Sequence, residues 1–453
     1  MDFGSLSLID RSHLAELPFE VRSATFAINI SDCADRNLHR LCEGVYQKIT
    51  RLAARFAETV GTVSAEYGVP VLQRRLSVTG VTELADGFGP EDLLHVARTL
   101  EGAAANVHVD RIGGFSADAR YGLSTAASQI ISSLPLVLTQ TSRVRAAVQV
   151  ASSETGVNLS AISLIAQKLR EAAEASADRN GDAAARLTIV ANQNLGYSHL
   201  TSCTTQPAWP DRSIHVSLGA AAVLKRTLER LSLGRKPVPW TAIAEHLQVA
   251  AFRAIRASEI VGREIAHRLK ADFGFIDPTL APTIRADDSV LGLLPLLGVG
   301  TFGAPGTTAA LALLHQVMNT AAQFAAPGRV LPARVMLSVL EDPVLAEATH
   351  AGQITLDQLG LYAAAGSCGL DLIPLPGETD VDTLGAIIAD QMALAVSRNQ
   401  SSSVRLIPIP GKSAGERVTY GSMLGEATIL PISGIGHSKP FLQRSGLYPL
   451  TCR

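Results

Sequence analysis

The sequence GAPGTTAALALL, residues 303–314, joins a turn of small residues directly to an apolar, helix-favouring series. Gly303 and Gly306 allow backbone angles that a Cβ atom would forbid. Thr307 or Thr308 can cap the helix that follows. The backbone N–H groups and the positive dipole end of such a helix start favour a carboxylate or phosphate. These four residues are therefore candidate substrate-binding residues, unless the turn only lets a buried helix pack closely.

Segments of strand length alternate with segments of helical periodicity on both sides of this stretch. Short apolar segments predict strands over residues 21–30, 71–79, 107–112, 145–150, 186–191, 213–218, 273–276, 334–339, 370–375 and 404–409. Apolar residues three or four positions apart predict helices over residues 35–67, 91–105, 158–175, 220–231, 240–270 and 381–397. Because the alternation has no long linker, we expect a single α/β domain over residues 1–453, layered or barrel-shaped.

The composition favours a large apolar core and excludes several classes of protein. Apolar residues make up 47% of the 453 residues, and the formal net charge is −2. This charge argues against a nucleic-acid partner, and the most apolar windows are too short to span a membrane. The five cysteines are widely scattered, so neither zinc nor a disulfide scaffold is indicated. No signal peptide is visible after Met1, and we expect a soluble cytoplasmic protein.

Small and polar residues follow several of the predicted strands. Two glycines, a phenylalanine and a serine occupy residues 113–116, where we expect a tight turn at the end of a strand. Ligand sites in α/β folds gather at the carboxyl ends of parallel strands. We therefore expect Gly113, Gly114 and Ser116 to contact a substrate.

Several longer segments resemble one family. They are EYGVP (66–70), IGGFSA (112–117), LAPT (280–283), DTLGAIIAD (382–390) and SVRLIPIPGK (403–412). They resemble the bacterial and archaeal domain of unknown function seven-eleven family, also called uncharacterised protein family 0210. The resemblance implies a fold like that of pyruvate formate-lyase and related glycyl radical enzymes, a ten-stranded α/β barrel of two half-barrels, in a homodimer. It implies no particular reaction, because fold kinship alone does not set the chemistry.

Thiol, radical and metal chemistry have weaker sequence signals. Radical chemistry needs a cysteine beside a C-terminal glycine, and the candidates are Cys203, Cys368 and Gly446. Free cysteines are more often small buried hydrophobes than nucleophiles, so we expect no radical and no cofactor. The acidic pairs 287–288 and 341–342, with Asp277, could instead bind a divalent metal, Mg²⁺ or Ca²⁺, although acidic pairs are usually solvated caps.

Two aspartates are the candidates for acid–base catalysis. Asp371 opens an apolar strand, and Asp288 precedes an equally apolar run. A carboxylate beside apolar neighbours is desolvated, which raises its pKa toward neutrality and suits it to general acid or base catalysis. Alternatively, each aspartate caps a helix or pairs with Arg285 or Arg405.

The sequence leaves two functions open. The first is an enzyme, of lyase or isomerase type, that performs radical-independent acid–base chemistry on a small anionic metabolite. The second is a non-catalytic small-molecule-binding or regulatory protein on the same barrel. Arg143, Arg145 and Arg285 could hold the anion, although surface salt bridges explain them equally well.

Overall fold

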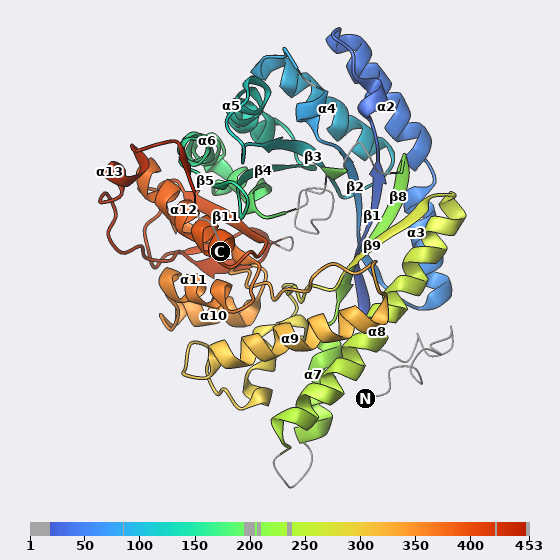
Figure 1. The fold of residues 1–453 in the computed structure, drawn as a ribbon, viewed down its shortest axis with the longest axis vertical. Helices are drawn as coiled ribbons and strands as arrows, with labels where there is room; N and C mark the ends of the chain where they lie inside the picture. Colours follow the sequence, from blue (N-terminus) through green and yellow to red (C-terminus); the bar gives the residue numbers. More distant parts are fainter. Residues whose placement is uncertain are drawn as a thin grey trace.

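A twelve-stranded mixed sheet forms the centre of the molecule (Figure 1). The computed structural model describes residues 19–449 except 85, 194–203, 206–209, 233–237 and 422–423. The strands of this sheet are β1 (Glu20–Ile28), β2 (Val71–Thr79), β3 (Arg111–Asp118), β4 (Val144–Ser152), β5 (Gly156–Asn158), β6 (Leu187–Ala191), β7 (Thr204–Thr205), β8 (Arg212–Gly219), β9 (Asp272–Asp277), β10 (Gly369–Pro376), β11 (Ser402–Ile409) and β14 (Leu447–Tyr448). A separate two-stranded ladder pairs β12 (Arg417–Thr419) with β13 (Glu426–Thr428).

Nine of these strands are neighbours in the order β10-β11-β6-β4-β3-β2-β1-β8-β9. The five central strands, β6 to β1, run parallel to one another. At one edge of this group β8 pairs antiparallel with β1 and parallel with β9. At the other edge β11 pairs antiparallel with β6 and parallel with β10.

Isolated bridges lie between β9 and β10. They are Ile276–Val330 and Leu280–Val335 on the side of β9, and Val335–Ser367 and Ser338–Asp371 on the side of β10. The sequence predicts a strand at 334–339, but this segment forms bridges without a continuous ladder.

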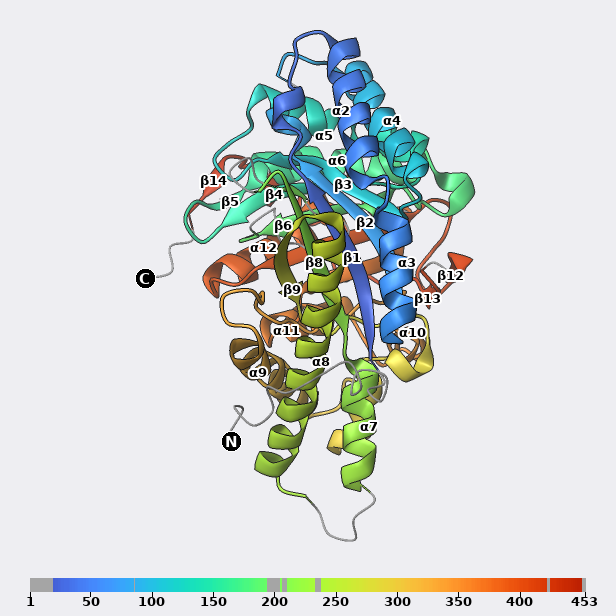
Figure 2. The ribbon, with the colours of Figure 1, turned by 90° about the vertical axis from the view of Figure 1, so that its right-hand side faces the viewer.

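Helices surround the sheet on its outer side (Figure 1). They are α2 (Leu38–Ala53), α3 (Phe56–Tyr67), α4 (Pro90–Asn106), α5 (Thr125–Gln140), α6 (Leu159–Glu174), α7 (Ala221–Ser232), α8 (Trp240–Leu269), α9 (Thr307–Ala325), α10 (Pro343–His350), α11 (Leu356–Ala364), α12 (Val381–Ser397) and α13 (Lys439–Leu442). Figure 2 shows α7 and the first half of α8 projecting together beyond the end of the sheet. Within the described residues, every helix is too short or too polar to cross a lipid bilayer.

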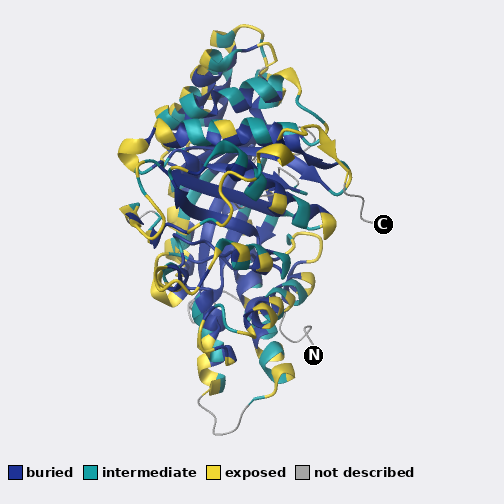
Figure 3. Ribbon diagram, turned by 90° about the vertical axis from the view of Figure 1, so that its left-hand side faces the viewer, coloured by how far each residue is buried: buried dark blue, intermediate teal, exposed yellow. Residues whose placement is uncertain are grey.

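Most residues of the central sheet are buried (Figure 3), and the two faces of β2 differ in polarity. On β2, Leu76 and Val78 belong to the apolar core and alternate with Arg75 and Ser77. Successive side chains of a strand point to opposite faces, so one face is apolar and the other polar.

The apolar face packs against the helices, and the polar face turns inward. On the outer side, the rings of Phe26 in β1 and Phe56 in α3 are 5.5 Å apart. On the inner side, the hydroxyl oxygens of Ser23 in β1 and Ser217 in β8 are hydrogen-bonded at 2.7 Å. A polar, buried inner face is unlike the apolar face that packs against the helices.

Two expected elements are wrong in detail. The single helix predicted over 35–67 is divided into α2 and α3, because Arg55 leaves helical backbone angles (φ −103°, ψ 4°). The turn predicted at 113–116 lies inside β3, where Gly114 (φ 129°) forms a bulge that the strand continues past.

Four helices were not predicted from the sequence: α5, α10, α11 and α13, of which α13 has only four residues. The α5 helix contains Pro135, which disfavours a helix interior. The α10 and α11 helices have only 8 and 9 residues, too few to give a clear periodic signal.

Candidate functional site

Five arginines lie on the inner face of the sheet and form what we call the arginine cluster: Arg22 of β1, Arg75 of β2, Arg111 of β3, Arg145 of β4 and Arg405 of β11. Four of them are buried, and Arg75 is half-buried. The sheet register brings them together, since Arg75 is directly opposite Arg111. Their charges act on one another: Arg22 and Arg405 disfavour the cation of Arg111, and Arg75, Arg111 and Arg405 that of Arg145.

Arg111 and Arg145 are the buried cations that lack an acidic partner at short range. Among the described residues, neither forms an ion pair with a carboxylate within 4 Å. Burial lowers the pKa of Arg111 and lowers that of Arg145 well below its usual value. The Arg145 guanidinium donates to the carbonyl oxygens of Ser142 (2.8 Å) and Val144 (3.1 Å). A bound anion would compensate these two charges, because a buried charge is costly unless it is paired.

Asp371, a predicted catalytic residue, lies beside the cluster in a bidentate ion pair. Its carboxylate accepts hydrogen bonds from Nε (2.5 Å) and one terminal nitrogen (2.7 Å) of Arg405. Both side chains are almost completely buried. Leu372 follows with φ 48°, at an irregularity in the pairing of β10 with β11. A strained backbone at this position is consistent with a carboxylate whose direction is fixed.

Asp288, the other predicted catalytic residue, lies on the short 3-10 helix η6 (Ala286–Asp288). Its Oδ2 atom is 3.5 Å from a terminal nitrogen of Arg22, but this buried oxygen accepts no hydrogen bond. Burial raises the pKa of Asp288 to about 6, with Glu20 adding to the rise and Arg22 opposing it. A carboxyl group with a pKa of about 6 lies in the range that suits a general acid or base near neutral pH.

Glu341 is a third carboxylate near the cluster. It is half-buried and favours the charged forms of Arg111 and Arg405. Within the described part of the chain it forms no ion pair of 4 Å or less. Glu341 thus acts on the two arginines through its charge, without a direct ion pair.

The predicted substrate residues Gly113, Gly114 and Ser116 lie on β3, the strand that carries Arg111. All three are buried. A Cβ atom at Gly114 would lie 2.3 Å from a methyl group of Val78, so this position needs glycine. These three residues therefore share a strand with Arg111, whereas Asp371 contacts Arg405 of β11 and Asp288 contacts Arg22 of β1.

The predicted turn at Gly303–Thr308 lies elsewhere. Figures 1 and 2 both place α9, which follows the turn, well away from β3. The expected cap is also different: Gly306 (φ 105°) is the N-cap, without a side-chain hydrogen bond. Thr307 lies inside the helix, where its hydroxyl donates to Ala304 O (2.8 Å) and accepts from Gly303 N (3.1 Å). Thr308 is exposed.

A family model described as "Uncharacterised ACR (DUF711)" matches residues 13–423. The chain belongs to this family. Among its curated relatives, the "UPF0210 protein" of Oleidesulfovibrio alaskensis is 34% identical over 446 residues, 98% of this chain and 96% of the relative. That of Desulforudis audaxviator is 36% identical over 439 residues, 96% and 95% of the two chains. That of Methanosarcina barkeri is 33% identical over 445 residues, 98% and 96%.

One solved structure similar to this member of the DUF711 family is the anaerobic ribonucleotide reductase from Thermotoga maritima with citrate in the active site. The match covers 88% of this chain and 80% of the reductase, with a TM-score of 0.43 and 8% sequence identity.

The acidic pair 341–342 was a candidate metal ligand in this DUF711 chain, but Asp342 is used by the protein itself. Its buried carboxylate accepts hydrogen bonds from the hydroxyl of Ser289 and from the backbone N–H groups of Val290, Leu291, Val344 and Leu345. Over the described residues, no group of three or more His, Cys, Asp or Glu side chains could hold a metal ion.

The thiol candidates give no activated nucleophile in the described part of the chain. Cys368 is buried at the start of β10, and burial raises the pKa of its thiol far above neutrality. Gly446 is held by α6, where its N–H donates to the hydroxyl of Ser160 at 2.8 Å. Cys203 lies outside the described residues.

Sequence reasoning missed Arg22, Arg75 and Arg111 as members of the site. The available signal was an arginine within each of three successive predicted strands: Arg22 and Arg111 lie near the starts of the buried strands β1 and β3, and Arg75 lies in the middle of β2. Arg145 and Arg405 were named, the first as an anion ligand and the second as a partner of Asp371.

Proposed function

We propose that the protein is an enzyme that performs radical-independent acid–base chemistry, of lyase or isomerase type, on a small anionic metabolite bound at the arginine cluster. The observation that carries the proposal is the pair of buried arginines, Arg111 and Arg145, without ion-pair partners among the described residues. Guanidinium groups are well suited to bidentate binding of carboxylate and phosphate.

Asp288 is the proposed proton-transfer residue. Its Oδ2 accepts no hydrogen bond, and its pKa of about 6 lets it exchange a proton near neutral pH. Asp371 is the second candidate, but Arg405 binds both of its oxygens. We assign Asp371 the role of positioning Arg405 toward the anion.

The same proposal includes closure of the sheet into a ten-stranded barrel. The segment 330–338 supports it, because its bridges reach Ile276 of the edge strand β9 and Asp371 of the opposite edge strand β10. With this segment as the tenth strand, two groups of five parallel strands would enclose the arginine cluster. A homodimer is also proposed, as the family resemblance implies, and light scattering would detect it.

The first test is calorimetric titration of the protein with small monocarboxylates, dicarboxylates and phosphate esters. Arg145→Gln should abolish binding, whereas Arg143→Gln should not, since Arg143 is partly exposed and already lies 3.5 Å from Glu101. Equal binding by both variants would contradict the assignment of the arginine cluster.

Catalysis is tested by exchange of ligand C–H hydrogens with D₂O or by turnover, in air. Asp288→Asn should abolish exchange and leave binding intact. A glycyl radical signal in electron paramagnetic resonance after anaerobic activation would contradict radical-independent chemistry.

The alternative is a non-catalytic binding or regulatory protein. The closed ion pair of Asp371 and Arg405 favours it, because this pair removes one of the two predicted catalytic carboxylates from proton transfer. Binding that depends on Arg145, without exchange or turnover in the native protein, would establish this alternative.

A further inference from the structure

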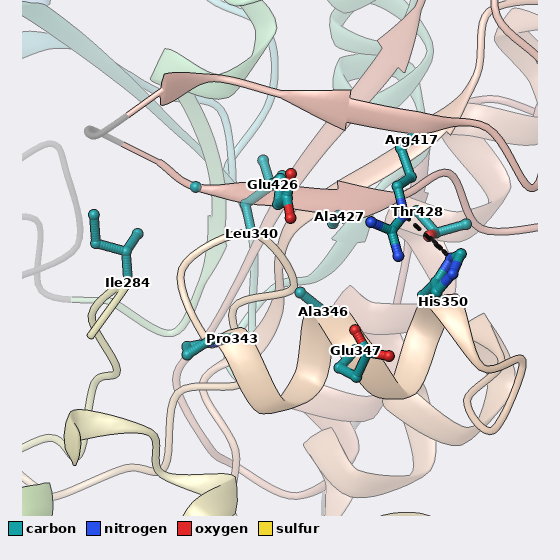
Figure 4. A pocket seen from close by; sticks show the side chains of 11 residues that line it. Ile284, Leu340, Pro343, Ala346, Glu347, His350, Arg417, Glu426, Ala427 and Thr428 are labelled. Atoms are coloured by element: carbon teal, nitrogen blue, oxygen red, sulfur yellow. Dashed lines mark hydrogen bonds between the residues drawn. The ribbon is translucent and has the colours of Figure 1, made fainter. Parts of the chain in front are cut away.

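A pocket of about 240 Å³ lies at the surface between α10 and the β12–β13 ladder (Figure 4). It is lined by Ile284, Leu340, Pro343, Ala346, Glu347, His350, Arg417, Gly425, Glu426, Ala427 and Thr428. Pockets for drug-sized ligands are about 300–1,000 Å³, so this one suits a smaller metabolite. It contains none of the residues of the arginine cluster.

One end of the pocket is cationic. There, Arg417 Nε donates a hydrogen bond to Nδ1 of His350 at 3.4 Å, and this nitrogen is also 3.3 Å from the hydroxyl oxygen of Thr428. This hydrogen bond uses only the Nε–H group of Arg417. The terminal N–H groups of its guanidinium are therefore available to a ligand. Figure 4 shows the guanidinium of Arg417 and the ring of His350 side by side.

The middle of the pocket is anionic. The carboxylates of Glu347, from α10, and Glu426, from β13, lie between the cationic end and the residues Ile284 and Pro343 in Figure 4. In the described part of the chain, neither glutamate forms an ion pair of 4 Å or less with Arg417. Opposite charges thus line one small pocket without neutralising each other.

The far end of the pocket is apolar. Ile284 and Pro343 project there, with Leu340 between them and the glutamates (Figure 4). Ile284 is 41% exposed, which is high for a large aliphatic side chain and leaves apolar surface for a ligand to cover.

We propose that this pocket binds a small aliphatic α-amino acid. Its carboxylate pairs with Arg417 beside His350, its ammonium group lies between Glu347 and Glu426, and its side chain covers Ile284 and Pro343. The carboxylate, the ammonium group and the side chain all branch from one Cα atom, and the pocket has one cationic, one anionic and one apolar wall for these three groups. Charge-assisted hydrogen bonds to both charged groups give specificity for a zwitterion.

The pocket is joined to the segments that carry the interior carboxylates. Leu340 immediately precedes Glu341, and Ile284 lies four residues before Asp288. Asp342 links the two segments through the hydroxyl of Ser289 at 2.6 Å. An amino acid in the pocket therefore contacts both segments, yet its binding does not depend on the proposed reaction.

The test is calorimetric titration of the full-length protein with three matched probes. These are L-leucine, 4-methylpentanoate, which lacks the amine, and 3-methylbutylamine, which lacks the carboxylate. Leucine should bind, and the two analogues should bind at least about tenfold more weakly, since each loses one charge-assisted contact. If either analogue binds as tightly as leucine, or if leucine does not saturate the protein up to about 10 mM, the proposal is overturned.

Variants of the lining residues test whether leucine binds in this pocket. Arg417→Gln and Glu426→Gln should each weaken leucine binding at least about tenfold, and Glu347→Gln provides a second test of the ammonium contact. The control Arg444→Gln changes an exposed arginine outside the pocket and should bind normally. Arg145→Gln should also bind leucine normally, and loss of binding in that variant would move the site to the arginine cluster. Thermal melting of each variant confirms that it is folded.

Discussion

Asp371 and Arg405, on the neighbouring parallel strands β10 and β11, are joined by two hydrogen bonds of 2.5 and 2.7 Å in the interior of the molecule. The aspartate is fully buried and the arginine is 2% exposed. This pair fixes one guanidinium of the arginine cluster. Asp288 differs, because its Oδ2 lies 3.5 Å from Arg22 and accepts no hydrogen bond.

Breaking this pair should strongly destabilise the protein. Asp371→Asn leaves Arg405 buried without its counter-charge, and we expect a loss of about 3–5 kcal/mol in the free energy of unfolding. Urea unfolding measures it. The double variant Asp371→Leu, Arg405→Met should recover much of the loss, because two apolar groups leave no charge unpaired.

The matched control is the exposed pair Asp178–Arg179, whose atoms approach to 3.2 Å. Asp178→Asn should cost less than about 1 kcal/mol. If Asp371→Asn costs no more than this control, Asp371 and Arg405 do not form the buried pair described above.

Asp342 should be far more important to stability than an ordinary helix cap. It caps α10 and at the same time accepts hydrogen bonds from the segment that follows Asp288. We expect Asp342→Ala to cost about 3 kcal/mol or more, because several buried donors lose their acceptor. Asp380, the partly exposed N-cap of α12, is the control, and Asp380→Ala should cost about 1 kcal/mol. Equal costs would contradict the linking role of Asp342.

The pKa of Asp288 predicts a pH dependence of stability. The folded-state pKa is raised from 3.8 to about 6, so between these values the folded state binds more protons than the unfolded state. Stability from this group is therefore present at low pH and is lost as the pH rises through about 6. By pH 8 the loss should be on the order of 2–3 kcal/mol.

Asp288→Asn removes this titration. The difference in unfolding free energy between the variant and the native protein should shift in favour of the variant between pH 4 and pH 8. Chemical unfolding at several pH values measures the shift. A difference that is constant with pH would show that Asp288 titrates at its ordinary value.

Variants of Gly306 and Arg145 distinguish the two candidate anion sites, the turn at residues 303–308 and the arginine cluster. Gly306 has φ 105°, so Gly306→Val should cost about 1–3 kcal/mol through backbone strain. Because the turn lies away from the arginine cluster, we expect this variant to bind anions normally and Arg145→Gln to lose binding. Calorimetry with the best anionic ligand decides between them, and the opposite result would place the anion at residues 303–308.

The sequence alone determined the classes of element and the family. Strand and helix periodicities are local, so the alternation of strands and helices was predictable from spacing, and the long motifs indicated the DUF711 family. The apolar residues that follow Asp371 and Asp288 in the sequence also singled out these two aspartates. Elements with a broken or short pattern, such as α5 with Pro135, did not give this signal.

Only the tertiary structure decided which charged residues meet. Arg22, Arg75, Arg111 and Arg145 belong to four separate strands, and strand periodicity shows only which residues share a face. Their proximity follows from strand order and register, such as Arg75 opposite Arg111. Strand order and register are both set by pairing between strands that are far apart in the sequence. For the same reason the sequence could offer Arg405 as a partner of Asp371 only as one alternative, whereas the parallel pairing of β10 with β11 places the two side chains in contact.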